Sequence, residues 1–68
     1  MNFQYRIIKN TIIEERKNDS VFSCTHHIED VVKLKKILNK DDKNITKYSM
    51  SILRSYEWLE KNHQEFLL

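Results

Sequence analysis

The chain opens on alternating apolar and polar residues, the pattern of a β-strand with one buried face. Phe3, Tyr5 and Ile7 are the apolar positions of this run. Two further short runs with strand character follow at residues 12–16 and 21–24. The pattern therefore predicts a short antiparallel β-hairpin or a three-stranded meander in the first third of the chain.

Turns in this sequence depend on Asn and Asp, because the chain contains no glycine and no proline. Both residue types tolerate the backbone of tight turns and bond to their own main chain. They separate the predicted strands at Asn10-Thr11 and at residues 17–20. These turns place the strands over about residues 3–24, although residues 10–17 also fit an amphipathic helix.

After the strands, apolar residues recur at spacings of three and four, which is typical of an amphipathic helix. This first helix is predicted over about residues 26–39, with Thr25 as its N-cap. Glu29 and Asp30 lie in its early turns and lysines lie near its end, the order that the helix dipole favours. Its predicted buried face consists of Ile28, Val31, Leu34 and Leu38.

A second helix is predicted over about residues 44–64, capped by Asp42 or Asn44. Its apolar face repeats every seven residues, as in a short coiled-coil seam. The seam consists of Ile45, Ile52, Leu59 and Phe66, joined by Tyr48, Leu53 and Tyr56. We expect it to pack on the first helix and the sheet; the alternative is that part of it packs on a second copy, giving a homodimer through this helix.

Together these elements predict an α+β fold in which a hairpin or meander precedes an α-helical hairpin. The 68 residues suffice for one domain, residues 1–68. The lone cysteine, Cys24, excludes a disulfide within the chain and indicates a reducing compartment. No apolar run suits a secretory leader or a membrane span, so we expect a cytoplasmic protein with no membrane contact.

The composition also limits the possible functions. Without glycine, the Gly-rich loops that cradle phosphates are excluded. Basic and acidic residues are interspersed and the net charge is only +2, less lopsided than is usual for a nucleic-acid binder. Lys, Ile and Asn are abundant, and their A/T-rich codons indicate the genome of a low-GC bacterium or its phage.

One basic stripe nevertheless qualifies as a candidate contact. Lys33, Lys36 and Lys40 fall on one face of the first predicted helix, where they could follow phosphates or meet an acidic partner. The simpler interpretation is a solvated face, because no aromatic residues interleave with the stripe for base stacking. A small nucleic-acid-binding or regulatory protein is therefore the second hypothesis.

Cys24, His26, His27 and His63 are the residues with the most evident chemistry. Thiolate and imidazole bind zinc, but the Cys-x-His-His order lacks the paired spacing of a zinc finger. A Cys–His nucleophile would need an orienting group and an oxyanion hole, and no motif supplies them. We therefore expect a core cysteine, two histidines in the first turn of a helix, no metal, no cofactor and no enzymatic activity.

Several short segments form a recognisable pattern: Tyr5-Arg6-Ile7-Ile8, Ile12-Ile13, the Asn-Asp turn, Phe22, and Val31-Val32-Lys33-Leu34 with Ile37-Leu38-Asn39 before a long helix. In this pattern the chain resembles small uncharacterised proteins of phages and mobile elements. The resemblance spans most of the chain without an exact motif. It implies a protein without enzymatic activity that binds a host protein, as the anti-CRISPR inhibitors of bacterial immunity do.

The second helix supplies the candidate contact surface. Trp58 lies away from the seven-residue seam among charged residues, and tryptophan and arginine dominate binding hot spots. The alternative is that the sheet or the N-terminal strand covers Trp58. The predicted partner-binding residues are Trp58, Arg54, Lys61 and Met50. The leading functional hypothesis is a phage-encoded or mobile-element-encoded protein that binds and inhibits or sequesters a host protein.

Overall fold

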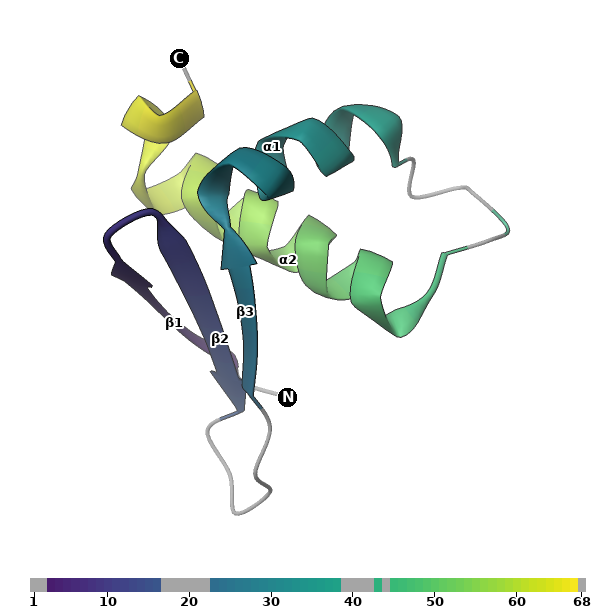
Figure 1. Ribbon diagram of the computed structural model, residues 1–68, viewed down its shortest axis with the longest axis horizontal. Helices are drawn as coiled ribbons and strands as arrows, with labels where there is room; N and C mark the ends of the chain where they lie inside the picture. The colour runs from purple at the N-terminus through teal and green to yellow at the C-terminus, as the bar shows by residue number, and fades with distance from the viewer. Residues whose placement is uncertain (1–2, 17–22, 39–42, 44, 68) are drawn as a thin grey trace.

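The computed structural model describes residues 3–16, 23–38, 43 and 45–67 of the chain. A three-stranded antiparallel sheet in the order β1-β2-β3 precedes two helices that pack together (Figure 1). This confirms the predicted α+β class and selects the meander over the hairpin. The elements are β1 (Phe3–Ile8), β2 (Thr11–Arg16), β3 (Ser23–His27), α1 (Ile28–Ile37), α2 (Lys47–Asn62) and the 3-10 helix η1 (Gln64–Leu67).

A two-residue turn, Lys9-Asn10, joins β1 to β2. Lys9 has a φ of 55°, in the left-handed region that glycine occupies at least cost. The chain has no glycine, so a lysine adopts this conformation at a cost of about 1 kcal/mol. The predicted turn at Asn10-Thr11 is thus wrong by one residue, and the helical alternative for residues 10–17 is wrong where β2 lies.

The third strand continues further than the sequence indicated. Thr25, the predicted N-cap of the first helix, is a strand residue paired with Ile13 of β2. α1 begins only at Ile28, whose backbone N–H donates to the Asn10 carbonyl at 2.8 Å. This bond satisfies one of the N–H groups that are free at the start of a helix, and the actual N-cap, His27, makes no side-chain cap bond.

α1 is amphipathic in the predicted sense. Ile28 and Val31 are buried, and Leu34 and Leu38 pack partly buried against the core. Acidic residues occupy the first turn and lysines the last, as the helix dipole favours. The helix ends at Ile37, where the next backbone N–H bonds to the Leu34 carbonyl at 2.8 Å.

α2 begins later than predicted, because Thr46 is its N-cap. The Thr46 hydroxyl accepts a hydrogen bond from the Ser49 backbone N–H at 3.2 Å. The predicted seven-residue seam is wrong at both ends: Ile45 precedes α2, and Phe66 follows it in η1, where it is 37% exposed. α2 spans Lys47–Asn62, so neither Ile45 nor Phe66 belongs to the helix whose buried face they were predicted to extend.

Some predicted positions lie outside the described residues. These are the turn at 17–20, positions 21 and 22 of the third strand, Asn39 and Lys40 at the end of the first helix, and the predicted caps Asp42 and Asn44.

The core lies where the sheet meets the helices. α2 packs against β2, and α1 packs against both α2 and β3. The core consists of Ile12, Ile28, Val31, Ile52 and Leu59. Neither α1 nor α2 combines the length and the apolar composition that crossing a bilayer requires.

Candidate functional site

A buried carboxylate lies among the core residues. Alternation along β2 directs Ile12 and Glu14 to the same face, and both side chains are fully buried. A buried charge is unfavourable unless other charges and donors replace its water. The strand register places Tyr5 of β1 directly opposite Glu14. The sheet therefore brings a phenol to the carboxylate.

Glu14 accepts four hydrogen bonds from three side chains. The Tyr5 hydroxyl donates to Oε2 at 2.6 Å, and the Ser51 hydroxyl donates to Oε1 at 2.9 Å. Arg54 donates from Nε to Oε2 at 3.0 Å and from Nη2 to Oε1 at 3.1 Å, a two-point pair. Ser51 and Arg54 are three residues apart on α2, a spacing that brings them to one face.

His26 extends this set, which we call the Glu14 network: Tyr5, Glu14, His26, Ser51 and Arg54. The Nε2 atom of His26 lies 2.7 Å from Ser51 Oγ. Because Ser51 gives its only proton to Glu14, this contact requires the proton of His26 to be on Nε2. Burial lowers the pKa of His26, which favours the neutral ring that this assignment needs.

The network contains a serine, a histidine and a carboxylate, the residue types of a serine-hydrolase triad. Their hydrogen bonds connect them in a sequence that does not suit that chemistry. In a triad the serine donates to the histidine, and the carboxylate holds the other ring nitrogen. Here Glu14 binds the serine itself, and His26 donates to Ser51. Ser51 is also only 1% exposed, so a substrate has no access to its hydroxyl. The geometry supports a structural role for the network.

The electrostatics agree with that role. Burial alone would raise the pKa of Glu14, but hydrogen bonds from Arg54, Tyr5 and Ser51 outweigh it and lower that pKa. The hydrogen bond to Glu14 raises the pKa of Arg54. Burial and the bond to Glu14 raise the pKa of Tyr5. At neutral pH the site therefore holds one carboxylate, one guanidinium and neutral partners.

Acidification is expected to destabilise the fold in two steps. His26 and Glu14 both have lowered pKa values in the folded chain, so the unfolded chain binds more protons as the pH falls. The contribution of His26 declines below its unfolded value of 6.5, and that of Glu14 declines below 4.5. Urea unfolding followed by circular dichroism should show the midpoint falling from neutral to acid pH.

Alkaline pH is also expected to destabilise the fold, in this case through Tyr5. The pKa of Tyr5 is raised on folding, so its contribution to stability is complete below the unfolded value of 10.0 and is lost as the pH rises further.

For the acid range, a urea midpoint that does not change with pH would contradict the pKa directions assigned to Glu14 and His26.

Two of the predicted partner-binding residues take part in internal contacts. The Arg54 guanidinium lies over the Phe3 ring, 4.3 Å from its centroid, in addition to its bonds to Glu14. Trp58 is half-buried and stacks on Tyr5, with the ring centroids 5.4 Å apart. β1 thus covers part of the predicted contact surface, which is the alternative that the sequence left open for Trp58.

The remaining predicted contacts lie at the surface. Met50 and Lys61 of α2 are exposed, as are Lys33 and Lys36 of α1. Lys40, the third lysine of the predicted basic stripe, lies outside the described residues. The structure therefore presents Lys33 and Lys36 to solvent.

The histidines do not occupy the positions expected for them. His26 and His27 belong to β3, not to the first turn of a helix, so they face opposite sides of the sheet. Cys24 is half-buried, two residues before His26. His63 lies beyond the end of α2, with its ring 4.8 Å from Trp58 and its Nδ1 3.2 Å from Glu65. Among the described residues no group of three or more His, Cys, Asp or Glu is placed to hold a metal ion.

Sequence reasoning missed the centre of the network, although one indication was available. Glu14 has the same parity as Ile12 along the strand, so alternation alone places a charge on the buried face. Ser51 and Ser55 similarly fall beside Ile52 on the buried face of α2, and both are buried. Only Ser51 meets a polar group of the sheet, Glu14, whereas the Ser55 hydroxyl donates to the Ser51 carbonyl within α2 at 2.9 Å.

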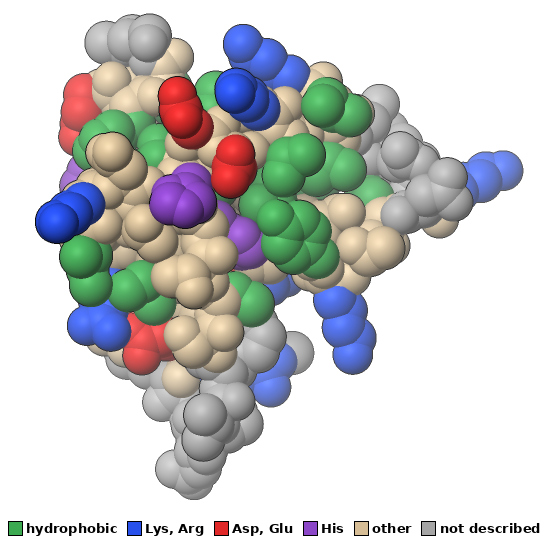
Figure 2. Space-filling view, in the orientation of Figure 1, with side chains coloured by type: hydrophobic (Ala, Val, Ile, Leu, Met, Phe, Trp, Pro, Cys, Tyr) green, Lys and Arg blue, Asp and Glu red, His purple; other side chains and the backbone are tan. Residues whose placement is uncertain are grey.

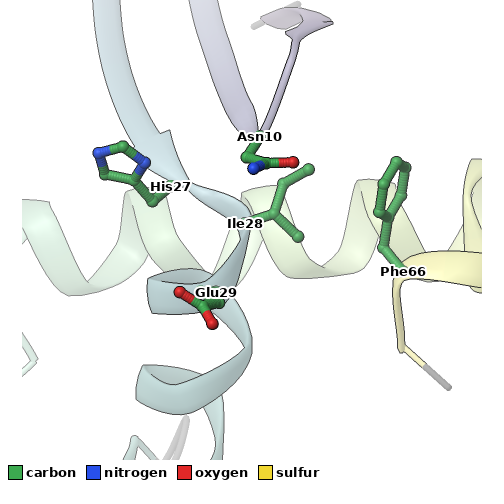
Figure 3. A pocket seen from close by; sticks show the side chains of 5 residues that line it. All are labelled: Asn10, His27, Ile28, Glu29 and Phe66. Carbon is green, nitrogen blue, oxygen red and sulfur yellow. The ribbon is translucent and has the colours of Figure 1, made fainter.

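A separate shallow pocket of about 320 Å³ lies at the start of α1, lined by Asn10, His27, Ile28, Glu29 and Phe66 (Figure 3). The His27 and Glu29 side chains extend to one side, and the Phe66 ring stands on the other side of Ile28. The volume is at the lower end of the range for small-molecule sites. All lining residues except Ile28 are exposed, so the pocket is open to solvent.

Comparison of the chain with protein-family models, with curated proteins and with solved structures gave no match. A functional proposal therefore rests on the chemistry and geometry of the chain itself.

Proposed function

We propose that this chain is a non-enzymatic cytoplasmic protein that binds a host protein and inhibits or sequesters it, as products of phages and mobile elements do. The observation that carries the proposal is the closed Glu14 network. Its carboxylate uses four acceptor positions on internal donors, and Ser51 is 1% exposed. Groups so fully engaged hold the fold together, so a partner would be bound by side chains that reach the surface, including the part of Arg54 that stays 30% exposed.

A side of α2 supplies the proposed contact surface. Met50, Arg54, Trp58 and Lys61 are spaced by four, four and three residues, which brings them within about 80° around the helix axis. The stripe combines apolar, aromatic and basic character, with tryptophan and arginine of the kind found in hot spots. Glu14 fixes Arg54, and Tyr5 supports Trp58, so little side-chain entropy is lost on binding.

The test is capture of a host protein by the tagged chain, expressed in a low-GC bacterium that carries an active CRISPR system. We expect one host protein to be recovered in near-stoichiometric amount, with loss of that protein in a Met50→Ala, Lys61→Glu double variant. Both residues are exposed, so the variant keeps the core intact. Lys9→Glu makes the same charge change at the exposed β1–β2 turn and should retain the partner.

Two results would refute this proposal. One is failure of the folded chain to retain any host protein above a tag-only control. The other is turnover of a substrate by the purified chain that Ser51→Ala abolishes without unfolding the protein.

A further inference from the structure

Positive charge is concentrated in one segment of the chain. Residues 31–56 contain six lysines and one arginine against two aspartates, a net charge of +5, whereas the rest of the chain carries −3. The two aspartates, at 41 and 42, lie outside the described residues, and the described part of this segment holds no acidic residue. Arg54 is paired with Glu14, so the overall value of +2 conceals a lysine-rich segment that runs from α1 to the start of α2.

An apolar surface lies within this region. Ile37, the last residue of α1, is 76% exposed, and Tyr48, near the start of α2, is 60% exposed. Leu34 lies three residues before Ile37 on α1, and Leu38 follows Ile37 as the C-cap of the helix; both are half-buried. We call Leu34, Ile37, Leu38 and Tyr48 the Ile37–Tyr48 patch. Figure 2 shows hydrophobic side chains gathered over the end of the helix pair where α1 finishes and α2 begins.

The aromatic member of the patch is held in place. The Tyr48 ring meets the His26 ring edge-on, with the centroids 5.4 Å apart. His26 is itself held by Ser51 of the Glu14 network. Tyr48 is thus largely exposed and also oriented, which lowers the entropy cost of a partner packing on it.

Lysines border the patch. Lys33 and Lys36 are exposed on α1, and Lys47 is exposed beside Tyr48. Figure 2 shows Lys and Arg side chains around the hydrophobic cluster, and Asp or Glu side chains beside it on one side. Lys35 differs, because its ammonium lies 5.5 Å from the Tyr56 ring centroid and so belongs to the α1–α2 contact.

We propose that the Ile37–Tyr48 patch docks an acidic protein segment that presents apolar side chains between its carboxylates. The proposal rests on the proposed function and specifies the chemistry of a partner. Apolar side chains of the partner would cover Ile37 and Tyr48, and its carboxylates would meet the lysines. The contact lies apart from the α2 stripe, because Met50 is rotated by about 200° from Tyr48 around the helix.

The same observations disfavour the other occupants. A second copy related by two-fold symmetry would bring one lysine border against the other, and like charges oppose that contact. Nucleic acid would meet the lysines, but its phosphates offer nothing to the exposed Ile37 side chain, and Tyr48 is the only aromatic member of the patch. An acidic protein segment with apolar side chains matches both the apolar residues of the patch and the lysines around it.

The test is an NMR titration of the isotope-labelled chain with a short amphipathic peptide of leucine and glutamate. We expect amide shifts at Leu34, Ile37, Leu38 and Tyr48 that weaken at high salt, because screening reduces the attraction between exposed charges. The matched probes are the same peptide with lysine for glutamate, polyglutamate and a single-stranded oligonucleotide. We expect no localised shifts with the lysine peptide, and weaker shifts with the other two.

Two variants sharpen the result. Ile37→Glu should weaken the leucine–glutamate peptide by about tenfold or more, since it replaces an apolar contact by a charge that repels the probe. Ile8→Glu makes the same change at an exposed apolar residue of β1, which belongs to neither proposed surface, and should leave the affinity unchanged. Both positions are exposed, and thermal unfolding verifies that each variant is folded.

The proposal is overturned if the patch does not respond to the leucine–glutamate peptide or responds equally to the lysine peptide. Stronger binding of the oligonucleotide would identify a nucleic-acid surface, and shifts that grow with protein concentration alone would identify a second copy. Host capture separates the two proposals. If a host protein is captured but the Ile37–Tyr48 patch shows no NMR shifts, only the docking proposal is refuted. If the patch shows the expected shifts but no host protein is captured, only the proposed function is refuted.

Discussion

Replacing Glu14 by glutamine is expected to lower the free energy of unfolding by about 2–4 kcal/mol. The amide keeps the shape of the carboxylate but loses its charge, and its nitrogen cannot accept the two hydrogen bonds that one carboxylate oxygen of Glu14 now accepts. Removing one member of a buried charged pair leaves its partner uncompensated. Arg54 is 30% exposed and can regain some water, which sets the value below that of a fully buried pair.

The measurement is urea unfolding of Glu14→Gln, with Glu15→Gln as its control. Glu15 is the next residue on the same strand, but its carboxylate is 41% exposed and pairs with the exposed Arg6 at 3.1 Å. A surface pair of this kind contributes less than about 1 kcal/mol, so the control should unfold almost as the wild type does. Equal midpoints for the two variants would show that the Glu14 network does not stabilise the fold.

Replacing Leu59 by alanine is expected to cost about 2–5 kcal/mol of stability. Leu59 is fully buried in the cluster where the sheet and both helices meet. The substitution removes apolar surface and leaves a cavity that neighbouring side chains fill only in part. Because a domain of this size has a stability near the low end of about 5–15 kcal/mol, the variant should be close to unfolding.

Ile37→Ala is the matched control for that experiment. Its side chain is 76% exposed at the end of α1, so its truncation should change the free energy of unfolding by no more than about 0.5 kcal/mol. Thermal unfolding by circular dichroism compares the two variants directly. Comparable losses for Leu59→Ala and Ile37→Ala would mean that Ile37 is buried in solution, and the proposed docking patch would then be wrong as well.

These stability predictions bear on the proposed function through shared residues. Arg54 joins the Glu14 network to the α2 stripe, and His26 joins the network to Tyr48 of the patch. Loss of Glu14 should therefore loosen both proposed surfaces. Exposed variants such as Ile37→Glu and Met50→Ala test binding without this complication.

The local pattern of the sequence was sufficient for the order of the main elements and for the buried faces of β1 and α1, but not for the whole face of α2, where Tyr48 is 60% exposed. Alternation at Phe3, Tyr5 and Ile7 predicted β1 with its inner face, and the spacing of Ile28 and Val31 predicted the buried side of α1. Burial of one face imposes a period of two on a strand and of about 3.6 on a helix. Such periodicity depends only on residues that are close together in the sequence, so it can be recognised without knowledge of the fold.

The ends of elements and the Glu14 network were decided only by the tertiary structure. Thr25 became a strand residue because β2 offered it backbone partners, which no local pattern records. Glu14 meets Ser51 and Arg54 across 37 and 40 residues, so their contact depends on strand register and on where α2 docks. Alternation can place a carboxylate on the buried face, but only the packed elements determine which donors make that burial favourable.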